Sequence, residues 1–145
     1  MAIDQFSRSL PMMLYRALDA VMPRFRKIFN DFGLTEQQWR VLRVLWEHEA
    51  MTLNRLARQT LIPAPSLVGI VDRLERDHLV TRQRSQADRR KVNVVLTSQG
   101  AALEDDVMPR VAMAYAELKQ SVDNETWNGV LAGLQEIAAI EAQSS

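Results

Sequence analysis

The stretch TRQRSQADRRKVNVVLT, residues 81–97, decides the fold, and it holds five basic residues and one acidic residue in a chain of zero net charge. Two short β-prone runs, VTRQR and VNVVLT, flank the polar sequence SQAD, which is the pattern of a β-hairpin. Residues 50–97 carry nine basic and four acidic side chains, and the remainder is acidic by the same margin. This asymmetry indicates a surface for a polyanion, although a solvated charged surface would give the same count.

Two short helices precede the hairpin. Thr52 caps the first, LNRLARQT, and the second covers residues 65–78 with an apolar stripe of Leu67, Ile70, Val71 and Leu74. Two helices joined by a tight turn and followed by a hairpin describe a winged helix-turn-helix, whose second helix enters the DNA major groove. We expect this helix to contact DNA through Ala64, Pro65, Ser66, Leu67, Gly69, Arg73 and Arg76.

The hairpin tip predicts a minor-groove contact, because the negative potential of a narrow groove favours a guanidinium group. Asp88 would repel phosphates, so we expect it to pair with an arginine and orient that side chain. Arg90, two residues away and on the same side of an extended strand, is the better partner than Arg89. We therefore expect Arg90 to enter the groove, and the other basic residues to contact phosphates: Arg82, Arg84, Arg89 and Lys91.

The rest of the chain predicts long helices, which makes the fold mainly α with a small β component (α+β). Helix starts are indicated at Ser9 with Pro11, at Thr35 with Gln38 in a capping box, at Thr97 and at Asp123. Pro23 should kink the first helix and Gly33 should end it. We expect a dimerisation helix over 1–34, the DNA-binding lobe over 35–97, and C-terminal dimerisation helices over 98–145.

Two stretches, LTEQQWRVLRVLWE and LARQTLIPAPSLVGIVDRLERDHLVTRQRSQADRRKVNVVLTSQG, resemble the MarR family of transcriptional regulators. The resemblance covers essentially the whole chain. It implies a homodimer on a palindromic operator, with residues 64–78 as the recognition helix and the Asp88–Arg90 segment as the wing tip. The sequence TEQQWR is most similar to members that control the catabolism of aromatic acids. The family usually has Gly where this chain has His78, and a left-handed conformation there would cost His some strain.

An effector pocket between the lobes is the second expectation from this resemblance. Arg16 and Arg43 would hold a carboxylate, Trp39 would stack on an aromatic ring, and Met12 would line the site. The plainer alternatives are a solvated or salt-bridged Arg16 and methionines that only fill a core.

Other classes of function find no support in the sequence. The chain has no Cys and only two His, His48 and His78, which excludes a recognisable metal site. It shows neither a nucleophile motif nor a phosphate-binding Gly-rich loop, so we expect no enzyme and no cofactor. Without an apolar run long enough for a membrane span or a secretory signal, cytoplasmic, nucleoid-associated residence is expected.

The sequence thus predicts a DNA-binding transcriptional regulator. We expect a repressor of an aromatic-compound catabolic or efflux operon, released from double-stranded DNA by a small phenolic or aromatic carboxylate. Two alternatives stay open at this point. One is a ligand-independent regulator or activator of the same fold, and the other is a winged helix used for protein–protein contact.

Overall fold

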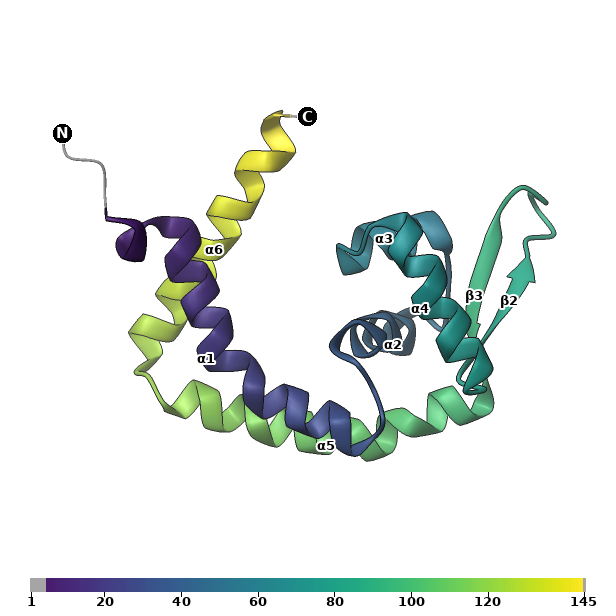
Figure 1. The fold of residues 1–145 in the computed structure, drawn as a ribbon, viewed down its shortest axis with the longest axis horizontal. Helices are drawn as coiled ribbons and strands as arrows, with labels where there is room; N and C mark the ends of the chain where they lie inside the picture. The colour runs from purple at the N-terminus through teal and green to yellow at the C-terminus, as the bar shows by residue number, and fades with distance from the viewer. Residues whose placement is uncertain (1–4, 145) are drawn as a thin grey trace. The chain divides into compact units, whose positions relative to one another are not determined.

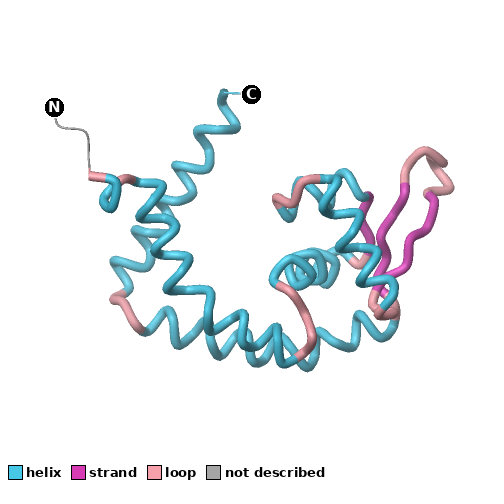
Figure 2. The backbone as a smooth tube through the Cα atoms, viewed as in Figure 1, coloured by secondary structure: helices cyan, strands magenta, loops and turns pink. Residues whose placement is uncertain are grey.

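The computed structural model describes residues 5–144 and divides into two compact units, Met1–Arg110 and Val111–Ser145. Helices dominate both units, and the strands form one hairpin with a short third strand (Figures 1 and 2). In chain order the elements are η1 (Phe6–Arg8), α1 (Leu10–Asp31), α2 (Glu36–His48), β1 (Ala50–Thr52), α3 (Leu53–Thr60), α4 (Ala64–Arg76), β2 (Val80–Arg84), β3 (Val92–Leu96), α5 (Ser98–Gln120) and α6 (Asn124–Ser144). The expected mainly helical fold class with a winged helix-turn-helix is confirmed.

Local capping signals set the start of α1, as the sequence indicates. The Ser9 hydroxyl accepts a hydrogen bond from the Met12 N–H at 3.4 Å, and Pro11 lies in the first turn. Gly33 follows the end of the helix with φ of +70°, a conformation that glycine adopts without steric cost. Pro23 lies inside α1, which continues as one helix to Asp31.

The core of the first unit is built by α2, α3 and α4. The capping box predicted at the start of α2 is present, with Thr35 Oγ1 accepting from the Gln38 N–H at 3.1 Å and Gln38 Oε1 accepting from the Thr35 N–H at 2.9 Å. Leucines from all three helices meet in the interior, each at most 1% exposed: Leu42, Leu45, Leu56, Leu67 and Leu74. Full burial stabilises each such side chain by about 1.5–3 kcal/mol, so this core fixes the position of α4.

The three strands form an antiparallel sheet in the order β1-β3-β2. The predicted hairpin is β2 and β3, paired from Val80 opposite Leu96 to Arg84 opposite Val92. The short strand β1 was not predicted, because three residues are too few to show an alternating pattern. β1 pairs with β3, so β3 is the central strand and β2 keeps one free edge.

Close packing at Gly100 joins the sheet to the start of α5. The Trp46 Nε1–H donates to the Gly100 carbonyl at 3.0 Å, and the Gly100 N–H donates to Thr97 Oγ1 at 2.9 Å. A Cβ on Gly100 would lie 2.0 Å from the Leu79 carbonyl oxygen, which is too close for any side chain. The glycine in the LTSQG stretch is therefore required by packing.

The second unit contains the end of α5 and the whole of α6. Asp123 caps α6, as expected, by accepting a hydrogen bond from the Thr126 N–H at 2.7 Å. The Tyr115 and Trp127 rings meet edge to face with centroids 5.4 Å apart. Large apolar side chains along α6 are exposed in this single chain, at Val130, Leu131, Leu134 and Ile137.

Candidate nucleic-acid interface

Helix α4 presents one exposed face opposite its buried stripe. Its predicted core residues Leu67, Ile70, Val71 and Leu74 are all buried. The exposed residues include six of the seven expected to contact DNA: Ala64, Pro65, Ser66, Gly69, Arg73 and Arg76. Leu67 is the correction, because its side chain is 1% exposed and belongs to the core. The small side chains gather in the first turns, where a backbone can approach a ligand closely.

The end of α4 has the left-handed geometry that the sequence analysis considered for His78. His78 has φ of +64°, and the Leu79 N–H donates to the Leu74 carbonyl at 2.9 Å, which closes the helix. The His78 side chain is exposed. A backbone reversal at this position turns the chain from α4 directly into β2.

The wing tip carries the predicted pair of Asp88 and Arg90. Asp88 Oδ1 accepts hydrogen bonds from Arg90 Nε and from the Arg90 backbone N–H, both at 3.1 Å, and Oδ2 accepts from Nη2 at 3.3 Å. These bonds, the side-chain ones first, hold the pKa of Asp88 below its ordinary value. The Arg90 side chain nevertheless remains 90% exposed, so it is oriented and accessible.

The Asp88–Arg90 pair forms in a turn. The expectation that an extended strand would place the two side chains on one side was therefore wrong. The Lys91 N–H donates to the Asp88 carbonyl at 2.9 Å and closes the turn. The Asp88 carboxylate also accepts a hydrogen bond from the Arg90 backbone N–H, two residues later, and so forms an Asx-turn, a geometry that Asp adopts readily. Arg84 Nη1 donates to the Arg89 carbonyl at 2.6 Å and braces the opposite side of the loop. Arg89 and Lys91 are exposed.

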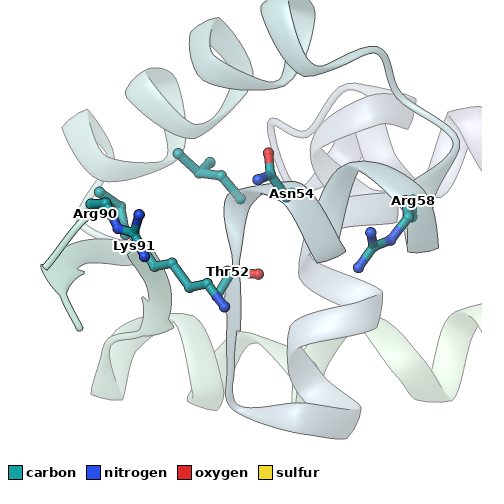
Figure 3. Close-up of a pocket in the computed structure, with 7 residues that line it drawn as sticks. Thr52, Asn54, Arg58, Arg90 and Lys91 are labelled. Atoms are coloured by element: carbon teal, nitrogen blue, oxygen red, sulfur yellow. The ribbon is translucent and has the colours of Figure 1, made fainter. Parts of the chain in front are cut away.

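Between the wing and the start of α3 lies a polar hollow of about 310 Å³. Arg90 and Lys91 reach it from the wing, and Thr52, Asn54 and Arg58 reach it from the other side (Figure 3). Thr52, Asn54 and Arg58 were not predicted as site residues from the sequence. Asn54 and Arg58 are four residues apart on one helix and therefore lie on the same face. This spacing is the feature of the sequence that could have indicated them as site residues. The hollow extends the basic surface from the wing to the first helix of the pair.

Arg82 does not belong to this exposed set, contrary to the expectation that it meets a phosphate. Its guanidinium binds the carboxylates of Asp72 and Glu75 on α4, and its side chain is 26% exposed. The charge pattern alone treated every arginine of the hairpin as available, and this one is already paired.

The four expected effector residues fall into two separate hollows of the single chain. Met12 and Arg16 line one along α1, and Trp39 and Arg43 line another between α2 and the end of α3. The single chain therefore does not bring all four residues into one hollow, and the pocket expected between the lobes stays a prediction. Trp39 stacks on Phe29 with centroids 4.7 Å apart.

The Trp39 hollow has an unusual hydrogen-bond donor. Trp39 Nε1 is buried, and no acceptor among the described residues is within hydrogen-bond distance. Buried donors nearly always have a partner, so this N–H is an exception among the described residues. Arg43 lies in the same hollow and pairs with Glu47 at 2.8 Å on the exposed face of α2.

Comparison with known proteins agrees with this geometry. Residues 34–92 match the model of the MarR family. The chain is 37% identical to the homoprotocatechuate degradative operon repressor of Escherichia coli over 132 residues, which cover 91% of this chain and 89% of that protein. The chain belongs to the MarR family. It is also 36% identical to the transcriptional regulator FarR of Neisseria gonorrhoeae, covering 92% of this chain and 91% of FarR.

The crystal structure of NadR in complex with 4-hydroxyphenylacetate has a TM-score of 0.78 to this chain at 33% identity, covering 95% of this chain and 98% of NadR. As a MarR-family protein, the chain is a DNA-binding transcriptional regulator with α3 and α4 as its helix-turn-helix and β2–β3 as its wing. Among the residues that the structure describes, no helix is long and apolar enough to cross a membrane. In the same part of the chain, no cluster of His, Cys, Asp or Glu has the arrangement of a metal site.

Proposed function

We propose that this MarR-family protein is a homodimeric repressor that binds a palindromic operator and is released by a small aromatic carboxylate. The observation that carries the DNA-binding part is the wing tip, where Asp88 orients an otherwise exposed Arg90. An arginine held in one orientation before binding loses less side-chain entropy when it enters a minor groove. The small-residue face of α4 supplies the major-groove contact.

The recognition surface extends over three elements. Ser66, Gly69, Arg73 and Arg76 are exposed on α4, and Arg89 and Lys91 are exposed on the wing. Arg58 lies in the hollow between the wing and α3. Apart from Arg90, which we assign to the minor groove, we assign these arginines and Lys91 to phosphate contacts. Guanidinium and ammonium groups on phosphates provide the sequence-independent part of the affinity.

Dimerisation is supported by exposed apolar side chains in both terminal regions. In the first half of α1, Leu10, Met13, Tyr15 and Leu18 are more than half exposed. In α6, Val130, Leu131, Leu134, Ile137 and Ile140 are exposed along one helix. Monomeric proteins seldom leave so many large apolar side chains in water, so a second copy of the chain is the proposed cover.

For the effector, the Trp39 hollow is the better of the two candidates. It combines an aromatic stack, a buried N–H without an acceptor, and the Arg43 guanidinium. The ion pair that Arg43 makes with Glu47 is exposed and worth only about 0.3–0.5 kcal/mol, so a ligand carboxylate can replace it. The ligand in the NadR complex, 4-hydroxyphenylacetate, has the ring and the carboxylate that this set would recognise.

The DNA-binding proposal is tested with the full-length protein and a duplex taken from beside its own coding region. Fluorescence anisotropy at several salt concentrations should give an affinity that falls steeply with salt, by a log–log slope of about 0.9 for each phosphate contact. Arg90→Ala should weaken binding strongly. Affinity that is weak and independent of salt would instead support a winged helix used for protein contact.

The effector proposal is tested by thermal denaturation with 4-hydroxyphenylacetate, hydroxybenzoates and cinnamates. A true effector raises the melting temperature, because it binds the native state and not the unfolded chain. Trp39→Phe keeps the ring and removes the N–H donor, so it should reduce this shift, and Arg43→Gln should abolish it. Arg16→Gln is the control for the second hollow, and loss of the shift in that variant would place the ligand on α1. The absence of any shift would favour a ligand-independent regulator.

A further inference from the structure

Arg82 on β2 is tied to the recognition helix by four hydrogen bonds. Its Nη1 donates to Glu75 Oε1 at 3.1 Å, and its Nη2 donates to the Val68 carbonyl at 3.2 Å and to Asp72 Oδ1. Its backbone N–H donates to Glu75 Oε2 at 3.0 Å. The guanidinium thus spans two turns of α4, and the same glutamate also satisfies the backbone on the free edge of β2.

The two carboxylates occupy a position that matters for DNA. Asp72 and Glu75 are three residues apart on α4, and Asp72 lies one turn beyond Gly69 on the exposed side of the helix. Their side chains are 47% and 40% exposed. Without a counter-ion, they would place two negative charges beside the face that approaches phosphates.

We propose that Arg82 is a positioning residue that masks these two acidic side chains and fixes the wing to the recognition helix. This inference rests on the proposed use of α4 and the wing in DNA binding. A phosphate contact by Arg82 would require breaking its bonds to both carboxylates, which would then repel the DNA backbone. Arg82 therefore supports DNA binding without contacting the DNA itself.

The neighbouring strand β3 holds the backbone of Arg82 in a fixed position. Arg82 pairs in the sheet with Val94, which is fully buried in the core. The side chain therefore extends from a fixed point of the sheet to a helix that is itself fixed by Leu67 and Leu74. A lysine cannot replace it, because one ammonium group lacks the planar fork that reaches three acceptors at once.

The test is a double-mutant cycle on DNA affinity. Arg82→Gln is measured in the wild-type protein and in a background with Asp72→Asn and Glu75→Gln, by anisotropy with the operator duplex. In the wild type, exposing two acids should reduce affinity by about tenfold or more, since like charges across an interface are strongly unfavourable. In the neutralised background, the same substitution should cost less than about threefold, because no acid remains to be masked.

Arg84→Gln is the matched control, since Arg84 lies two residues along the same strand and makes no hydrogen bond to α4 among the described residues. Its cost should be equal in both backgrounds. Arg82→Lys adds a variant that keeps the charge, and it should also lose affinity. Thermal denaturation of each variant separates loss of the fold from loss of binding. If Arg82→Gln does not fold, the operator affinity of Arg82→Lys relative to the wild type tests the role of Arg82 instead.

An equal cost of Arg82→Gln in both backgrounds, or wild-type affinity in Arg82→Lys, would overturn the masking role and make Arg82 an ordinary phosphate contact. Either result leaves the proposed function standing, because the wild type still binds with its salt dependence. A wild-type protein that binds no duplex overturns the proposed function and this inference together.

Discussion

The substitution Gly69→Ala should move stability and DNA affinity in opposite directions. Gly69 lies inside α4, and a Cβ placed there meets nothing within 4 Å. Alanine is favoured over glycine in a helix interior by about 1 kcal/mol, and no steric term opposes this gain in the free protein. For a chain of 145 residues, 1 kcal/mol corresponds to a rise of about 3 °C in melting temperature.

DNA affinity should fall for the same reason that stability rises. The open space beside Gly69 is on the exposed face of α4, between the small residue Ser66 and the cation Arg73. If that face enters the major groove, a new methyl group occupies space that a base edge or sugar needs. Misfits of one methyl group in a close-packed contact cost about 1–3 kcal/mol, so we expect a loss of about tenfold in affinity.

The assay pairs a thermal melt with operator titration at one fixed salt concentration. Gly129→Ala is the control for the gain in helix stability, because Gly129 also lies inside a helix with open space around it in the single chain. A Gly69→Ala variant that is more stable and binds DNA as tightly as the wild type would refute the docking of this face in the groove.

Three further substitutions test the structural role of single residues. Gly100→Ala should lower the free energy of unfolding by about 3 kcal/mol, because its Cβ would lie 2.0 Å from the Leu79 carbonyl oxygen; chemical denaturation measures this. His78→Gly should raise it by about 1 kcal/mol, since the residue has φ of +64° and glycine relieves the strain; an unchanged midpoint would contradict this. Asp88→Ala should weaken operator binding although it removes a negative charge, because Arg90 loses its orienting partner, and tighter binding would show that the role is wrong. The lowered pKa of Asp88 means that the pair is intact above the ordinary carboxyl range and is lost only as pH falls through the lowered value, so its effect should not change between about pH 6 and 8.

The sequence predicted those features that depend on neighbouring residues. Caps at Ser9, Thr35 and Thr52 bind N–H groups three residues away, so the spacing in the sequence contains the whole interaction. The Asp88–Arg90 pair was found for a similar reason, although the local backbone is a turn. Contacts between residues two to four apart can be predicted from a sequence even where the predicted backbone conformation is wrong.

Features that depend on distant residues were not predictable in this way. Arg82 and Asp72 are ten residues apart and belong to different elements, so a charge pattern could not show that they are paired. The separation of Arg16 from Trp39 depends on how α1 and α2 pack. Likewise, the unpartnered Trp39 N–H is a property of the folded core and has no signature in the chain.

The pairing of Arg82 also changes how a neutral chain can bind a polyanion. Counting charges gives residues 50–97 an excess of basic groups, but it leaves Asp72 and Glu75 on the recognition helix unexplained. In the structure, Arg82 forms ion pairs with both Asp72 and Glu75, and Arg90 forms one with Asp88. Within the described residues of this segment, seven other cations form no ion pair: Arg55, Arg58, Arg73, Arg76, Arg84, Arg89 and Lys91. They are spread over α3, α4 and the wing, and Asp77 is the one acid of the segment that forms no ion pair among the described residues, so the surface that remains is positive.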